Sequence, residues 1–203
     1  MTIKLAGVVI LAGGESSRMG SPKALLSLPN GETLLDFHIR HAKRLNVPVM
    51  VADNGKRLCH DTTVKIIDDY LPNQQNGKGA GALSAMASAM NQVMSPYHYL
   101  LVISCDSLVQ ANQVFDKLHY AATDNEAVIY LKAEKDYPLL GLYRTDLLIK
   151  LNDYLDKGQR AVMKFLADKK IQTAALPNEW ITLANFNTKN EFDLALNSLN
   201  EIG

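Results

Sequence analysis

Runs of apolar residues alternate along this chain with segments in which apolar side chains recur every three or four positions. The runs predict buried strands, and the three-to-four spacing predicts helices with one apolar face. Residues 5–11 and 99–104 are continuous apolar runs, which is typical of strands covered on both faces. Residues 34–45 have helical spacing, and Thr33 is placed to cap that helix.

The same pattern extends to the end of the chain. We predict strands over residues 5–11, 48–52, 64–67, 99–104, 127–131, 139–143, 171–176 and 181–184. We predict helices over residues 34–45, 81–93, 112–121, 145–156 (capped by Thr145), 161–167 and 190–199. Strands that alternate with helices indicate a three-layer α/β fold with a mostly parallel central sheet, here as a single domain over residues 1–203. Ligands bind such sheets beyond the carboxyl ends of the strands.

Composition narrows the class of protein. The chain has 203 residues, 47% of them hydrophobic, and a formal net charge of zero, so no overall charge draws it to nucleic acid or to an anionic membrane. No segment reaches the roughly 20 apolar residues of a membrane span. Cys59 and Cys105 have no CxxC partner, so we expect neither a metal knuckle nor a disulfide, and Cys105 should be a buried thiol at a strand end. We expect a cytoplasmic protein; a short secretory signal after Lys4 is the weaker alternative.

A glycine-rich loop with two cations follows the first strand. Gly13 and Gly14 allow a ligand to approach the backbone closely, and neighbouring amides can bind anionic oxygens. Arg18 and Lys23 add positive charge suited to phosphate. The spacing is neither G-x-x-x-x-G-K-[ST] nor G-x-G-x-x-G, and the glycines alone fit a plain turn equally well. With the cations, the loop predicts a nucleoside triphosphate site.

Further polar residues come directly after other predicted strands. Asp106 follows the strand over 99–104, and a carboxylate there suits Mg²⁺, although it could instead cap the next helix. Asp68 and Asp69 follow the strand over 64–67; one could face the nucleotide, or both could lie in a solvated turn. Gly81 stands where a helix is predicted to begin, which favours an anion. A flexible surface loop is the alternative for this glycine-rich segment.

The last candidates lie near the end of the chain. Asn185 and Asn187 are two positions apart, so both amides would point to the same side of an extended segment. There they could orient phosphate oxygens, although a strand-end turn with a helix cap is the plainer interpretation. Arg160 and Lys164 could meet an anionic partner or could simply lie on a solvated helix face.

These segments, in this order, resemble the signature motifs of the molybdenum cofactor guanylyltransferases, a family of nucleotidyltransferases with a Rossmann-like fold. The similarity extends from Leu11 to Thr188. It rests on the strings 11–14 (LAGG), 17–26 (SRMGSPKALL), 65–69 (KIIDD), 77–81 (GKGAG), 105–106 (CD), 138–144 (PLLGLYR), 158–164 (GQRAVMK) and 185–188 (NFNT). Pro22 stands where the family has Asp, Lys78 where it has Pro, and the sister cytidylyltransferases usually carry Ala in place of Gly13.

The resemblance implies an enzyme that transfers GMP from GTP to molybdopterin and releases pyrophosphate, with Mg²⁺ as cofactor. The implied catalytic residues are Arg18, Lys23 and Asp106, with Asp106 also the metal ligand. The implied nucleotide site consists of Leu11, Ala12, Gly13, Gly14, Lys23, Asp69, Gly81 and Asp106. Candidates for the second substrate are Asn185, Asn187 and Arg160.

The implied partners are GTP, molybdopterin and, as a further candidate, proteins that mature molybdoenzymes. Three alternatives remain open at this point. The chain could be a cytidylyltransferase or sugar-phosphate nucleotidyltransferase, a non-catalytic carrier that binds nucleotide or pterin, or an α/β interaction domain.

Overall fold

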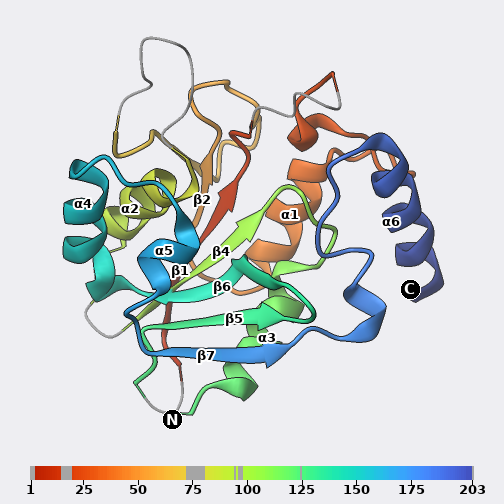
Figure 1. The fold of residues 1–203 in the computed structure, drawn as a ribbon. Coiled ribbons are helices and arrows are strands. Elements are labelled where there is room, and N and C mark those ends of the chain that lie inside the picture. Colours follow the sequence, from red (N-terminus) through yellow and green to blue (C-terminus); the bar gives the residue numbers. More distant parts are fainter. Residues whose placement is uncertain are drawn as a thin grey trace.

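The computed structural model describes residues 3–14, 20–71, 81–93, 95, 98–123 and 125–202. Their strands form one seven-stranded sheet in the order β3-β2-β1-β4-β6-β5-β7 (Figure 1). β6 pairs antiparallel with both β4 and β5, whereas every other pairing between the described strands is parallel. The strands are β1 (Leu5–Leu11), β2 (Val49–Ala52), β3 (Lys65–Ile67), β4 (Tyr99–Ser104), β5 (Val128–Lys132), β6 (Asp136–Arg144) and β7 (Ile171–Ala175). The predicted mostly parallel sheet is therefore confirmed.

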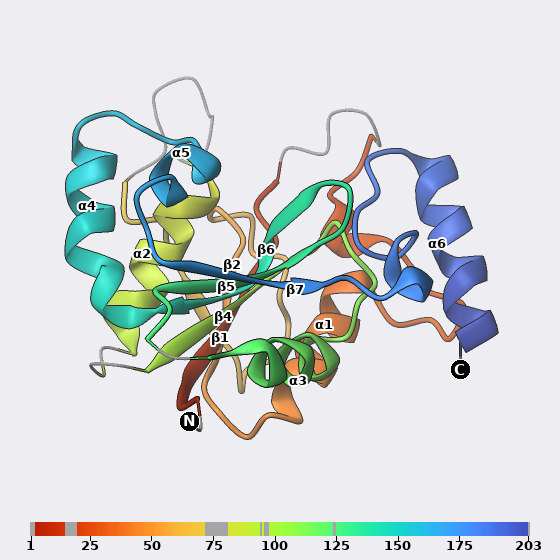
Figure 2. The same ribbon diagram turned by 60° about the horizontal axis from the view of Figure 1, so that its bottom comes forward.

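Helices cover both faces of the sheet. Figure 2 shows α2, α4 and α5 on one side, and α1 and α3 on the other with α6 beyond them. The helices are α1 (Leu34–Lys43), α2 (Ala82–Gln92), α3 (Ala111–Ala121), α4 (Leu148–Asp156), α5 (Val162–Leu166) and α6 (Lys189–Ile202). Short 3-10 turns occur at η1 (Lys23–Leu25), η2 (Thr145–Leu147) and η3 (Asn178–Trp180). No helix in the described ranges is long and apolar enough to cross a membrane.

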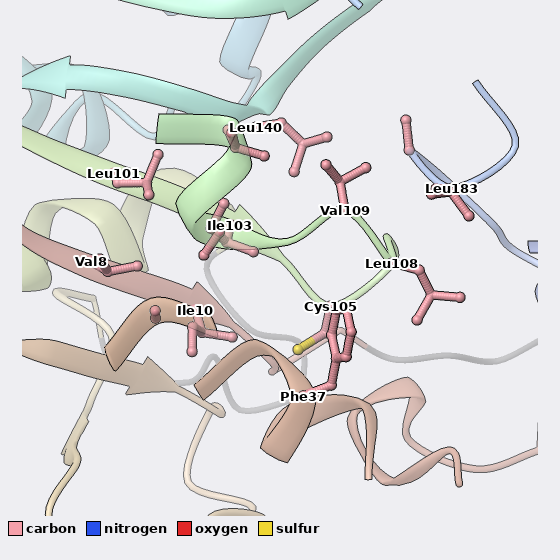
Figure 3. Close-up of a cluster of buried hydrophobic side chains, with 14 of the residues drawn as sticks. Val8, Ile10, Phe37, Leu101, Ile103, Cys105, Leu108, Val109, Leu140 and Leu183 are labelled. Carbon is pink, nitrogen blue, oxygen red and sulfur yellow. The ribbon is translucent and has the colours of Figure 1, made fainter. Parts of the chain in front are cut away.

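The two faces of the central strands bury separate apolar clusters, because successive strand residues point to opposite sides. Val8 and Ile10 of β1 belong to the cluster that includes α1, α3 and α6, whereas Val9 belongs to the cluster that includes α2, α4 and α5. Figure 3 shows the first cluster, with Phe37 of α1 beside Cys105. Cys105 is buried, as predicted, and burial raises the pKa of its thiol.

Four parallel strands end level with one another. Leu11, the last residue of β1, pairs with Ala52 of β2 on one side and Ser104 of β4 on the other. Ala52 in turn pairs with Ile67, the last residue of β3. The segments that follow these strands therefore leave the sheet along one edge, where the sequence placed its candidate ligand-binding residues.

Two predictions about local structure were wrong. Residues 181–184 form no strand: the carbonyl of Trp180 accepts hydrogen bonds from the N–H groups of Leu183 (3.0 Å) and Ala184 (2.8 Å), which closes a turn after η3. Leu183 and Ala184 are buried in this turn, and their apolar character imitated a strand. Thr145 does not cap α4, because its hydroxyl donates to the carbonyls of Ser95 (2.7 Å) and His98 (3.2 Å).

The predicted cap of α1 is confirmed. The Thr33 hydroxyl accepts the backbone N–H of Asp36 at 3.1 Å, and the Asp36 carboxylate accepts the N–H of Thr33 at 3.3 Å. This reciprocal pair satisfies two N–H groups at the helix start.

His38 of α1 is fully buried, and its ring joins the helix to the segment after β4. Its Nε2 lies 2.9 Å from the carbonyl oxygen of Ser107, so Nε2 carries the proton and donates. Nδ1 has no hydrogen-bond partner among the described residues. Burial lowers the pKa of His38 from 6.5 to about 4, because protonating Nδ1 would place a charge in the apolar core.

This burial predicts a loss of stability in mild acid. Below its unfolded pKa of 6.5, His38 takes up a proton more readily in the unfolded chain than in the folded one, so stability should fall as the pH drops toward about 4. Between about pH 7 and about pH 5, the loss from this residue should be about 2 kcal/mol. His38→Gln retains a donor for Ser107 and should remove that part of the loss in urea unfolding curves. Exposed His60→Gln is the matched control, and an equal effect of the two substitutions would contradict the prediction.

Candidate functional site

The glycine pair and Asp106 leave the sheet from adjacent strands. The N–H of Cys105 donates to the carbonyl of Leu11 at 3.1 Å, and the N–H of Ala12 donates to the carbonyl of Ala52 at 2.8 Å. Main-chain pairing thus continues one residue beyond β1 and β4. This pairing brings Gly13 and Asp106 to neighbouring positions at the carboxyl edge, as the sequence predicted.

The close packing of Gly13 explains why a glycine occupies this position. A Cβ atom built on Gly13 would lie only 2.9 Å from the Cβ of Asn54, in the segment after β2. Asn54 has a φ of +59°, and the turn that it forms packs directly against Gly13. Gly14 is exposed, and an added Cβ would meet no described atom within 4 Å.

Lys56, which is not among the predicted site residues, also contacts the glycine pair. Its ammonium group donates to the carbonyls of Gly13 (2.9 Å) and Gly14 (3.0 Å). No motif in the sequence singles out Lys56, because the contact spans more than 40 positions and depends on how the segment after β2 folds back.

Lys23 and Asp106 are connected through the two asparagines near the end of the chain. The Lys23 ammonium donates to the carbonyl of Phe186 (2.6 Å) and to Oδ1 of Asn187 (3.0 Å). The Asn187 amide donates to Oδ1 of Asn185 at 3.0 Å, and the Asn185 amide donates to Oδ2 of Asp106 at 2.9 Å. A continuous chain of hydrogen bonds therefore runs from the cation to the carboxylate. We call these four side chains the Lys23–Asp106 chain.

The segment that carries the asparagines is held from both ends. The N–H of Phe186 donates to the carbonyl of Asp106 at 2.8 Å, and the Phe186 ring is fully buried. The Glu191 carboxylate accepts the N–H groups of Asn187 (2.6 Å) and Thr188 (3.0 Å), and these bonds lower the pKa of Glu191. The spacing Thr188-x-x-Glu191 is that of a capping box, a sequence signal that could have identified Glu191.

The Asp69 segment lies against the start of α2. Asp68 is exposed and Asp69 is partly buried, so the two carboxylates have different environments. Two residues on, the N–H of Leu71 donates to the Ser84 hydroxyl at 2.9 Å, and the N–H of Ser84 donates to the carbonyl of Gly81 at 3.1 Å. Gly81 caps α2 with a φ of +83°, a conformation that favours glycine. Ser84 thereby connects the segments of two predicted nucleotide-binding residues.

Of the two predicted arginines, only Arg160 belongs to the described part of the chain, because Arg18 lies outside the described residues. The Arg160 guanidinium donates to the carbonyls of Leu155 and Gln159, each at 2.7 Å, at the end of α4. Figures 1 and 2 show α4, whose last turn Arg160 contacts, and α6, which follows the two asparagines, on opposite sides of the molecule. The contact of Arg160 with a second substrate stays a prediction.

Asp106 fits a cation that is shared with substrate. Within the described ranges, no three His, Cys, Asp or Glu side chains gather closely enough to hold a metal. Asp106 is partly exposed, and its Oδ2 accepts the hydrogen bond from the Asn185 amide. Mg²⁺ commonly takes one or two carboxylates, several waters and phosphate oxygens, so this single carboxylate suits it better than it suits a metal held by protein alone.

Comparisons with known proteins agree with this architecture. The family model described as "MobA-like NTP transferase domain" matches residues 8–172. A "Probable molybdenum cofactor guanylyltransferase" of Mycolicibacterium paratuberculosis is 30% identical over 191 residues, covering 93% of each chain. A "Molybdenum cofactor guanylyltransferase" of Haemophilus influenzae is 26% identical, covering 93% of this chain and 95% of that one.

Solved structures show the same fold. "Molybdopterin-guanine dinucleotide biosynthesis protein A" from Archaeoglobus fulgidus superposes with a TM-score of 0.76 at 17% identity, over 96% of this chain and 99% of that one. A Mycobacterium tuberculosis protein in complex with manganese superposes with a TM-score of 0.64 at 15% identity, over 98% of this chain and all of that one.

The family model covers most of the chain, from β1 to the start of β7. It includes the glycine pair, Lys23 and Asp106, whereas Asn185 and Asn187 lie beyond it. Family, fold and motif order thus agree, and the chain belongs to the MobA-like NTP transferase domain family and is a nucleotidyltransferase.

Proposed function

We propose that this protein transfers GMP from GTP to molybdopterin, forms a guanine dinucleotide and releases pyrophosphate. The observation that supports the chemistry is the Lys23–Asp106 chain, which connects a cation to a carboxylate at the edge of the sheet where the glycine pair also leaves β1. The choice of GTP and molybdopterin is supported by the names of the relatives that cover most of the chain.

The phosphate groups of GTP would lie between the glycine pair and Lys23. A phosphate oxygen of molybdopterin attacks the α-phosphorus of GTP; the new P–O bond forms as the bond to the bridging oxygen breaks, and pyrophosphate leaves. The protein needs no nucleophile of its own, because positioning and charge stabilisation can supply the catalysis. Lys23 offsets the charge on the phosphates, and Arg18 is proposed for the same role.

Asp106 is the residue proposed to hold Mg²⁺, and the bound ion would neutralise phosphate charge. The hydrogen bond from Asn185 orients one carboxylate oxygen of Asp106, and Asn187 orients Asn185 in turn. The two asparagines thus have a positioning role, in addition to the contact with the second substrate that we propose for them and for Arg160.

The guanine base is assigned to the opposite side of the glycine pair. Asp69 follows β3, two strands from β1, and Gly81 begins α2 beside it. We propose that Asp69 accepts hydrogen bonds from the base, while the backbone near Gly81 borders it. Leu11 and Ala12 complete the nucleotide site at the end of β1.

Nucleotide preference is the first test. With Mg²⁺ present, GTP should raise the melting temperature of the protein more than CTP, ATP or UTP at equal concentration, because binding to the folded state stabilises it. A preference for CTP would overturn the choice of GTP, and no response to any nucleotide would contradict the proposed nucleotide site.

Removal of the Asp106 charge should abolish transfer. We expect Asp106→Asn to lower kcat for pyrophosphate release by at least about 100-fold, because the variant would hold Mg²⁺ less tightly and the negative charge that develops on the phosphates would lose its counter-ion. Asp116→Asn on the exposed face of α3 makes the same charge change and should leave kcat unaltered. If a folded Asp106→Asn variant released pyrophosphate near the wild-type rate, the assignment of Asp106 as the metal ligand would be wrong.

The contact between Gly13 and Asn54 generates a paired test. Gly13→Ala should weaken GTP binding about tenfold, since the new methyl group would displace the turn at 2.9 Å. Asn54→Gly removes the opposing Cβ and suits the positive φ of that position, so the double variant should recover most of the affinity. Calorimetric titration with GTP measures both. Equal affinity of the wild type and Gly13→Ala would contradict this explanation of the glycine.

A further inference from the structure

The segment after β2, residues 53–58, is built to hold one side chain against the glycine pair. Asp53 is fully buried, and its two carboxylate oxygens accept the N–H groups of Gly55 (3.1 Å) and Leu58 (2.8 Å). Asn54, Gly55 and Arg57 all have positive φ, at +59°, +73° and +53°. A loop with this many left-handed residues is unfavourable unless its surroundings hold it, and such loops occur where a site needs a defined geometry.

The result of this geometry is the double hydrogen bond of Lys56. Its main chain is fixed by a bond from its own N–H to the carbonyl of Asp53 (3.3 Å), and its ammonium reaches the carbonyls of Gly13 and Gly14. Lys56 is exposed, so its ammonium group could have been solvated by water alone. The segment over residues 53–58 instead directs the Lys56 ammonium to the backbone carbonyls of the glycine pair.

The direction of these carbonyls determines the direction of a neighbouring amide. In a trans peptide the C=O and the following N–H point to opposite sides, and the described residues contain no cis peptide. Because the carbonyl of Gly13 faces Lys56, the N–H of Gly14 faces away from it. A positive charge on the carbonyl side also offsets the partial negative charge of two oxygens that would otherwise oppose a bound polyphosphate.

We propose that Lys56 is a positioning residue of the nucleotide site, which turns the Gly13–Gly14 peptide so that its amide side receives the triphosphate. This inference rests on the proposed function, because it assigns the triphosphate to the glycine pair. It adds a third cation to Lys23 and Arg18, one that acts on the backbone rather than on a motif side chain.

The test compares three variants. Lys56→Met keeps the length of the side chain and removes its charge and donors, and Lys56→Arg restores both. Lys43→Met removes a lysine of α1 that pairs with Asp61. We expect Lys56→Met to raise KM for GTP about tenfold with kcat changed less than threefold, and Lys56→Arg to recover most of the loss. Lys43→Met should match the wild type.

A competition measurement separates this inference from the proposed function. Inorganic tripolyphosphate with Mg²⁺ displaces a fluorescent nucleotide, chosen as the one that the wild type binds in the nucleotide panel. Its affinity should fall about tenfold in Lys56→Met, while the melting temperature stays within about 2 °C of the wild type. Equal tripolyphosphate affinity in Lys56→Met and the wild type, or equal losses in Lys56→Met and Lys43→Met, would overturn the role of Lys56. A wild type that prefers another nucleotide would overturn only the proposed use of GTP.

Discussion

The pairing of Leu11 with Ala52 on one side and Ser104 on the other is the constraint on which the site depends. Parallel strands that end level release their following segments together, and here those segments carry glycines, carboxylates and lysines. A shift of β4 by one residue would reverse the faces of its side chains and move Asp106 away from the glycine pair. The apolar packing of β1 and β4 on both faces makes such a shift costly, because it would expose residues that are now fully buried.

Backbone groups, rather than side chains alone, organise the polar edge. Lys23 contacts the carbonyl of Phe186, Lys56 contacts those of Gly13 and Gly14, and Phe186 donates to the carbonyl of Asp106. Backbone carbonyls are placed by the fold and do not lose rotamer freedom when they bind. Long lysine side chains anchored in this way are ordered before substrate arrives, which lowers the entropy that binding must overcome.

Much of this arrangement was predictable from the sequence, because strand and helix periods decide the faces of β1, β4 and α1, and parallel connectivity decides where their ends lie. The motif residues Gly13, Lys23 and Asp106 follow from those ends. Lys56 could not be predicted in the same way, since its role depends on three positive-φ residues and a buried Asp53 that has no local signature. The error at residues 181–184 has the opposite cause, because the buried turn is as apolar as a strand. A segment of only four residues is too short for its apolar spacing to distinguish a turn from a strand.

Lys23 contacts Phe186 and Asn187, which lie 163 and 164 positions further along the chain. Contacts between distant parts of a chain form late in folding, since the intervening loop must first be closed. During synthesis, β1 and the glycine pair emerge long before their partners near the start of α6. The cation and the carboxylate are therefore connected only when nearly the whole chain has folded, so a truncated or half-made chain would hold the glycine pair without a finished site.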